Sequence, residues 1–292
     1  MSNSYRQNQI PTAPPPPQSM YNFEEMNQLN QMNQMNQFVE TQDQKLDRIK
    51  RQYEISPYFA RKLEMLRGME IVMLCDDSGS MTQVGSYDKQ LSRALTRWEE
   101  LRQRTTIIME IATIMDPDGI DIYFLNRSPA FGIRDVSQVD QLFTIPPAGG
   151  TQLTKVFNQI LQDKSEIIKE RKVLIIIATD GEPRQYDSCG RDIDGKHEFM
   201  KALQNRKPID RLLVSIMACT DDDKVMSYLN KIDKNVKFVD VLDDYENEKK
   251  EILEARGRNF IFNLGDYIVK TLVGPMDPEL DNLDEKNKCI IL

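Results

Sequence analysis

The strongest constraint on this fold is the run of apolar residues 173–178, which contains no polar side chain. A strand that is apolar at every position is typical of the centre of a parallel sheet, because helices cover both of its faces. Residues 71–75 have the same character. Three further strands are predicted at 120–125, 212–219 and 236–242. These runs predict a sheet that is mostly parallel.

Amphipathic segments alternate with the apolar runs. The spacing of apolar residues predicts a long helix over 87–115, in which Trp98 is expected to lie in the core. Further helices are predicted at 136–143, 153–168, 196–205, 223–232, 245–256 and 259–272. This alternation favours an α/β fold, a doubly wound and mostly parallel sheet flanked by helices.

The domain is expected to occupy only part of the 292-residue chain. Residues 1–45 are rich in Asn, Gln and Pro and predict a disordered tail. Residues 46–67 predict a helical lead-in, and we expect at least the part after Pro57 to dock on the domain. A single domain is then expected over 68–272, followed by a flexible tail over 273–292.

Composition excludes several classes of function. A formal net charge of -8 argues against a nucleic-acid-binding surface, which usually carries a basic patch. No apolar stretch reaches the roughly 18 residues of a membrane-spanning helix, and the N-terminus resembles neither a signal peptide nor a myristoylation motif. The four cysteines form no disulfide framework. We therefore expect a cytoplasmic protein that binds no nucleic acid.

Oxygen-bearing side chains follow two of the predicted central strands. Asp76, Ser78 and Ser80 stand at alternate positions of a tight turn. Thr151, after two glycines, and Asp180, after the most apolar strand, add two more oxygens. Ligands of doubly wound sheets bind beyond the carboxyl ends of the strands, and this is where Asp76 and Asp180 are expected. Clustered carboxylate and hydroxyl oxygens suit a hard divalent cation.

The pattern Asp-x-Ser-x-Ser, with a distant Thr and a distant Thr-Asp-Gly, resembles the metal-ion-dependent adhesion site of von Willebrand factor A domains. The resemblance implies that fold, with Mg²⁺ as the usual ion and Mn²⁺ as a possible substitute. The residues implied at the ion, directly or through one water, are Asp76, Ser78, Ser80, Thr151 and Asp180. Mg²⁺ takes six oxygen ligands, so an acidic residue of a partner protein can supply the one that is missing. The alternative is that each piece is an ordinary turn at the end of a strand.

The C-terminus matches a Cys-aliphatic-aliphatic-X box, in which Cys289 is the acceptor and Leu292 favours geranylgeranyl over farnesyl. A single lipid chain anchors weakly, and residues 276–288 carry more acids than bases where a polybasic patch usually helps. The box therefore predicts reversible, peripheral attachment to the cytosolic face of a membrane. The alternative is an unmodified apolar chain end.

A proline-rich segment lies near the N-terminus. Such segments adopt a preformed extended helix that recognition domains bind. The tetrapeptide Pro11, Thr12, Ala13 and Pro14 resembles the late-domain motif that binds the ubiquitin-conjugating-enzyme-variant domain of endosomal sorting complexes. It predicts a proline-motif reader as a possible partner, whereas the alternative is a generic proline-rich ligand or a plain linker.

Two classes of function compete. The first is a non-enzymatic, Mg²⁺-dependent module that captures a partner's carboxylate at a membrane, with a sorting adaptor that acts through the proline motif as its alternative. The second is a metal-dependent hydrolase or phosphotransferase, which needs a base near the ion. Apart from Asp77, at a variable position of the motif and expected to face solvent, and Glu182, the sequence offers none. The single histidine, His197, is expected at the surface, so we expect a binding module.

Overall fold

The computed structural model describes residues 40–88 and 91–285. The chain divides into two compact units, Met1–Thr41 and Gln42–Leu292, and nearly all of the first lies outside the described residues. Three expectations from the sequence also fall outside them: most of the disordered tail, the proline motif at 11–14 and the prenylation site Cys289. The second unit carries the sheet and the candidate metal site.

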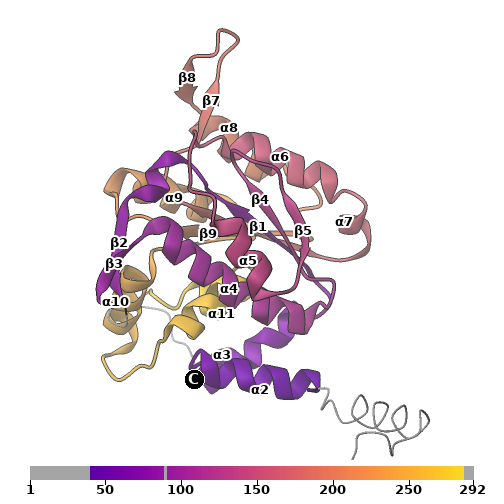
Figure 1. The fold of residues 1–292 in the computed structure, drawn as a ribbon, viewed down its shortest axis with the longest axis vertical. Helices are drawn as coiled ribbons and strands as arrows, with labels where there is room; N and C mark the ends of the chain where they lie inside the picture. The colour runs from indigo at the N-terminus through magenta and orange to yellow at the C-terminus, as the bar shows by residue number, and fades with distance from the viewer. Residues whose placement is uncertain (1–39, 89–90, 286–292) are drawn as a thin grey trace, which may run out of the picture. The chain divides into compact units, whose positions relative to one another are not determined.

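A six-stranded sheet forms the centre of the second unit, in the order β10-β9-β6-β1-β4-β5 (Figure 1). Its strands are β1 (Glu70–Cys75), β4 (Ile120–Phe124), β5 (Ala130–Ile133), β6 (Val173–Thr179), β9 (Leu212–Ala218) and β10 (Val239–Leu242). All neighbours are parallel except β5, which runs antiparallel to β4. The chain leaves β1 for β4 on one side and returns to β6 on the other, so a topological switch lies between β1 and β6.

Helices cover both faces of this sheet (Figure 1). They are α2 (Gln42–Gln52), α4 (Arg97–Met115), α5 (Val136–Phe143), α6 (Leu153–Asp163), α7 (Ile167–Glu170), α8 (Lys196–Asn205), α9 (Asp223–Asn235), α10 (Tyr245–Arg256) and α11 (Leu264–Val273). Pleating sends Ile71 and Met73 of β1 into a core with α4 and α11, and Val72 and Leu74 into a second core with α6, α8 and α9. The predicted α/β class, with a mostly parallel sheet flanked by helices, is confirmed.

The helix predicted over 87–115 begins later than expected. Its first part is a hairpin of β2 (Val84–Asp88) and β3 (Arg93–Thr96). Thr96 then caps α4: its hydroxyl accepts from Glu99 N at 3.2 Å, and the Glu99 carboxylate accepts from Thr96 N at 2.8 Å. Leu91, which the helical spacing assigned to the buried face, is 55% exposed. The capping residues Thr96 and Glu99 therefore fix the start of the helix. The apolar spacing before them belongs to the hairpin, although it also fits a helix.

The helical lead-in is interrupted before Pro57. Glu54 has a φ of 53°, which lies outside the right-handed helical region, and α2 ends before it. A second helix, α3 (Pro57–Lys62), starts with proline at its first position and continues into a 3-10 turn at Leu63–Leu66. Phe59 and Leu63 are fully buried in the first core. Docking of the part after Pro57 is thus confirmed.

The C-terminal segment differs from the prediction of a flexible tail after residue 272. A 3-10 turn at Gly274–Met276 and the short α12 (Pro278–Asp281) follow α11 directly. Leu280 and Leu283 are fully buried, and Arg256 Nε of α10 donates to Leu283 O at 2.8 Å. The sequence did not predict this ordered structure, because the segment contains few apolar residues and many polar ones.

Several smaller features also depart from the sequence prediction. The helix predicted over 153–168 is divided into α6 and α7. The strand predicted from residue 236 begins at Val239, because Phe238 has a φ of 56° that extended backbone does not adopt. A hairpin of β7 (Arg184–Tyr186) and β8 (Asp192–Asp194) extends beyond the carboxyl end of β6 (Figure 1). In the described part of the chain, no helix is both long and apolar enough to cross a membrane.

Candidate metal-binding site

Asp76 is the first residue after β1, and its carboxylate is held in one orientation. Its backbone N–H donates to Ala178 O at 2.9 Å, which extends the ladder between β1 and β6 by one residue. Asp76 Oδ1 accepts from Ser78 N at 2.9 Å, and Oδ2 accepts from Thr179 Oγ1 at 2.6 Å. The side chain is fully buried. The position of this carboxylate therefore follows from the register of the two central strands.

Hydroxyls connect the turn after β1 with the turn after β6. Ser78 Oγ lies 3.0 Å from Ser80 Oγ, and Ser80 Oγ donates to Asp180 Oδ1 at 2.8 Å. Ser78 and Asp180 are both buried. Four of the five side chains singled out from the sequence thus meet at the switch point between β1 and β6.

Thr151 reaches the same place on the loop before α6. This loop is fixed to the turn after β1, since Gly79 N donates to Gly149 O at 3.2 Å and Ala148 N donates to Asp77 O at 2.7 Å. A Cβ placed on Gly181, the residue after Asp180, would lie 3.4 Å from Thr151 Oγ1. The Thr151 hydroxyl therefore lies against the turn that carries Asp180, and all five side chains are brought together.

Charge at this site is concentrated on two buried carboxylates. Burial, and after it the neighbouring Asp180 carboxylate, raise the pKa of Asp76 to about 6. Arg97 balances the second carboxylate, because its Nη1 donates to Asp180 Oδ2 at 2.8 Å. The contact of Arg97 with the site was not predicted from the sequence, because the predicted helix over 87–115 placed Arg97 in its interior. The capping pattern Thr96-x-x-Glu99 is the signal that would have put Arg97 at the helix start, next to the site.

Asp77 does not face solvent, contrary to the expectation from the sequence. Its side chain is buried, its Oδ1 accepts from Asn126 N at 2.8 Å, and its Oδ2 lies 3.1 Å from Arg127 Nε. Glu182, the other carboxylate considered as a base, pairs with Lys196 Nζ at 2.9 Å. Both candidate bases are therefore engaged in ion pairs.

His197 is exposed on α8, as the sequence predicted. Burial raises the pKa of the Cys219 thiol to about 12, so this cysteine stays protonated at neutral pH. Neither residue has the features of an activated nucleophile or general base in this structure.

The five oxygens fit a hard divalent cation. Two carboxylates and three hydroxyls are the oxygen donors that Mg²⁺ and Ca²⁺ accept, and the carboxylates supply a charge that matches a divalent ion. Arg97 limits this fit, since its guanidinium already neutralises Asp180. The donor set therefore suits a cation whose affinity is moderated by an internal positive charge.

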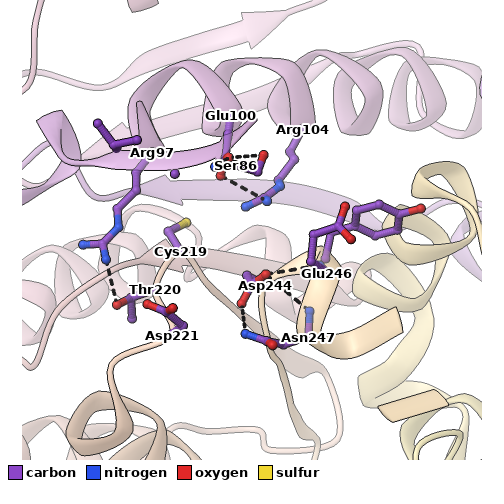
Figure 2. A pocket seen from close by; sticks show the side chains of 13 residues that line it. Ser86, Arg97, Glu100, Arg104, Cys219, Thr220, Asp221, Asp244, Glu246 and Asn247 are labelled. Carbon is purple, nitrogen blue, oxygen red and sulfur yellow. Dashed lines mark hydrogen bonds and ion pairs between the residues drawn. The ribbon is translucent and has the colours of Figure 1, made fainter. Parts of the chain in front are cut away.

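A cavity of about 330 Å³ lies next to the site and shares Arg97 with it (Figure 2). Arg97 Nη2 donates to Thr220 Oγ1 at 3.0 Å, so one guanidinium bridges the cavity wall and Asp180. Arg104 is buried in the same wall, and its Nη1 has no hydrogen-bond partner within residues 40–88 and 91–285. The cavity lining also carries acidic side chains, namely Glu100, Asp221, Asp244 and Glu246.

Comparisons with known proteins leave the family open. No protein-family model matches the chain, and no curated protein matches it. Two crystal structures of the pilus adhesin SpaC from Lactobacillus rhamnosus GG, one of them in an open conformation, resemble part of it with TM-scores of 0.43 and 0.39 at 14% and 15% identity. The similarity covers 70% of this chain but only 31% and 30% of the adhesin chains. A resemblance this distant carries no argument about function.

Proposed function

We propose that the chain is a protein-binding module of the von Willebrand factor A type, in which a divalent cation captures a carboxylate of a partner protein. Mg²⁺ is the expected ion, with Mn²⁺ as a possible substitute. Its ligands, direct or through one water, would be Asp76, Ser78, Ser80, Thr151 and Asp180. The observation that carries the proposal is the convergence of these five oxygens at the switch point of the sheet.

Each side chain has a distinct task in this proposal. Asp76 and Asp180 supply negative charge from buried positions, where attraction to a cation is stronger than in water. The hydroxyls of Ser78, Ser80 and Thr151 would be neutral ligands of the ion, so that the total negative charge of the site stays low. A bound Mg²⁺ would offer its remaining coordination position to an incoming oxygen. An acidic side chain of a partner matches that position in both charge and chemistry.

Catalysis is the weaker alternative. A metal-dependent hydrolase needs a base or nucleophile that is available near the ion. Asp77 is held by Asn126 and Arg127, and Glu182 is held by Lys196. These contacts support binding over turnover.

Partner capture from a cell lysate tests the proposal. The full chain is immobilised and exposed to lysate in Mg²⁺ or in EDTA, as wild type, as Thr151→Ala and as the control Thr144→Ala, which lies outside the site. We expect partners that are retained in Mg²⁺ by wild type and control and lost in EDTA and in Thr151→Ala. An identical set of partners in EDTA contradicts the proposal, as does Mg²⁺-dependent phosphoester turnover that Asp180→Ala abolishes.

The location of the module is a separate proposal. The Cys-aliphatic-aliphatic-X box at Cys289 supports attachment by a geranylgeranyl group to the cytosolic face of a membrane. A single prenyl chain without a basic patch supports reversible attachment, so that capture of a partner would strengthen residence at the membrane.

A further inference from the structure

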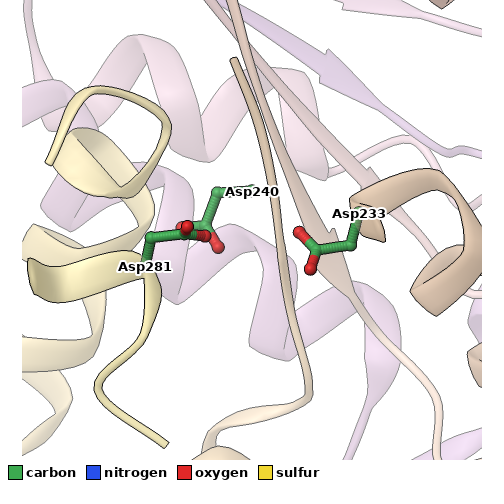
Figure 3. A group of neighbouring side chains, drawn as sticks. All are labelled: Asp233, Asp240 and Asp281. Atoms are coloured by element: carbon green, nitrogen blue, oxygen red, sulfur yellow. The ribbon is translucent and has the colours of Figure 1, made fainter. Parts of the chain in front are cut away.

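A second group of oxygens lies at the edge of the sheet, away from the switch point. Asp240 belongs to the edge strand β10, Asp233 to the last part of α9 and Asp281 to the end of α12. One carboxylate oxygen of each of the three lies within 4.8 Å of the other two. Figure 3 shows Asp233 pointing toward the other two carboxylates from the opposite side of the strand. The consecutive elements α9 and β10 and the more distant α12 thus direct negative charge at one point.

Asp240 is the residue that this group leaves unsatisfied. Its side chain is 1% exposed, and its Oδ2 is buried and accepts no hydrogen bond from the described residues. A buried carboxylate oxygen without a donor is unfavourable and calls for a missing partner. A Cβ on Gly274 would lie 1.6 Å from this same Oδ2, so only glycine at 274 leaves room for it.

Among the described residues, the donors near Asp240 and Asp233 leave the Asp240 oxygen unsatisfied. Lys270 is buried near Asp240, but its Nζ already forms an ion pair with Glu248 Oε1 at 2.9 Å. Asp233 receives one neutral donor, since Val241 N donates to its Oδ1 at 3.2 Å. Asp240 therefore keeps a buried carboxylate oxygen that none of these donors satisfies.

We infer that Asp233, Asp240 and Asp281 form a second divalent-cation site, which fastens the C-terminal segment to β10 and α9. Ca²⁺ fits this site better than Mg²⁺, because it accepts several carboxylates in irregular geometry, whereas Mg²⁺ demands a near-octahedral array and gives up its waters reluctantly. The site differs from the proposed Mg²⁺ site in its residues and lies two strands away from β6, on β10.

Protonation is the competing way to remove this charge. Burial raises the pKa of Asp240 well above its ordinary value, so a proton would satisfy the carboxyl in the absence of an ion. The two accounts predict different responses to Ca²⁺, which makes them separable by experiment.

Thermal unfolding at pH 7 in EDTA and in Ca²⁺ provides the test. All proteins are full-length and carry Asp180→Asn, so that the first site does not contribute. The comparison is between this background, the same background with Asp281→Asn, and the same background with Asp118→Asn, an exposed control four strands from β10. Asp281 is partly exposed, so its replacement leaves the core intact.

The inference predicts a gain in Tm in Ca²⁺ that Asp281→Asn removes. In Ca²⁺ at about a hundredfold above its Kd, the background and the Asp118 control should gain roughly 5 °C in Tm, and the Asp281→Asn protein should not. If Ca²⁺ raises no Tm, or raises that of Asp281→Asn equally, the inference is overturned and protonation accounts for the cluster.

Discussion

At the scale of the residue, charge balance decides what the candidate site can hold. Asp76 and Asp180 contribute two buried carboxylates, and the Arg97 guanidinium lies against one of them at 2.8 Å. A divalent ion bound there would therefore meet both attraction and a nearby repulsion. In the proposed site, Arg97 would compete with the cation for Asp180 and so lower the affinity of the site for it.

Replacing Arg97 with glutamine should strengthen Mg²⁺ binding. Removal of one positive charge beside the proposed ion is worth roughly 1 kcal/mol even when solvent screens it strongly, which is about fivefold in Kd. Calorimetric titration measures the change, with Arg102→Gln as a control on the exposed part of the same helix. Unchanged or weaker binding would mean that Arg97 orients Asp180 for the ion instead of competing with it.

Asp243 provides a test of buried charge away from the metal site. Burial, and then the charges of Glu251 and Glu248, raise its pKa from 3.8 to about 7. The folded state thus binds more protons between pH ~4 and ~7, and this group lowers stability as pH rises through that window. Asp243→Asn should therefore stabilise the protein at pH 8 by about 1 to 2 kcal/mol, allowing for solvent screening, and have little effect at pH 4. Urea unfolding at the two pH values checks this, and an equal effect at both would contradict it.

Individual site residues were predictable to different degrees. Asp76 and Asp180 could be placed from the sequence, because Asp76 directly follows the apolar run 71–75 and Asp180 follows the apolar run 173–178 after one intervening residue. The environment of Asp77 could not, since its partners Asn126 and Arg127 are supplied by the loop after β4. Adjacent carboxylates of one turn can therefore both be buried against different partners, which the local sequence pattern does not reveal.

At the scale of the element, the start of α4 organises this edge of the molecule. The Glu100 carboxylate accepts from both the backbone N–H and the hydroxyl of Ser86, which holds the β2–β3 hairpin against the helix. A Cβ on Gly85 would lie 2.6 Å from Glu100 Oε1, so the close approach requires glycine. The same helix start carries Arg97 to Asp180.

Loss of the cap at Thr96 should weaken this arrangement. Thr96→Ala removes the hydroxyl that accepts from Glu99 N, and N-cap replacements of this kind cost about 1 kcal/mol of stability. Urea unfolding should show this loss, whereas the control Thr106→Ala, a partly exposed threonine within the same helix, should show much less. Equal losses in the two variants would argue against a capping role.

The elements that the sequence predicted best are those with the clearest burial pattern. The strand at 173–178 was predictable because both of its faces are covered, so every position is apolar. The β2–β3 hairpin was not, because Leu91 and Leu95 continue the apolar spacing of the helix that follows. The ordered C-terminal segment was missed because it has few apolar side chains, and because contacts that the sequence does not show, such as Lys62 Nζ to Glu279 Oε2 at 2.6 Å, help to hold it.

At the scale of the whole molecule, one α/β domain carries two groups of acidic oxygens. The first lies at the switch point between β1 and β6, and the second joins β10 and α9 to the C-terminal segment. Doubly wound topology accounts for the first, since strand ends converge there. The second could not be predicted from the sequence, because its three carboxylates come from segments that only the folded chain brings together.

The proposed membrane attachment is tested on the full chain. Cys289→Ser removes the only thiol of the C-terminal box, so the variant should leave the membrane fraction and accumulate in the supernatant when cells are fractionated. Leu292→Ser is an informative companion, because it should retain prenylation while favouring the farnesyl group. If wild type and Cys289→Ser distribute alike, the prenylation proposal is wrong.

The central claim is that the five oxygens at the switch point hold a divalent cation, and direct titration with Mg²⁺ tests it most closely. Calorimetry on the full chain with Asp281→Asn, which removes the second acidic group, should give one binding event per chain. Adding Asp180→Asn should abolish that event, while adding Asp163→Asn, an exposed control, should leave it unchanged. Mg²⁺ binding that survives Asp180→Asn, or no binding before that change, would contradict the account.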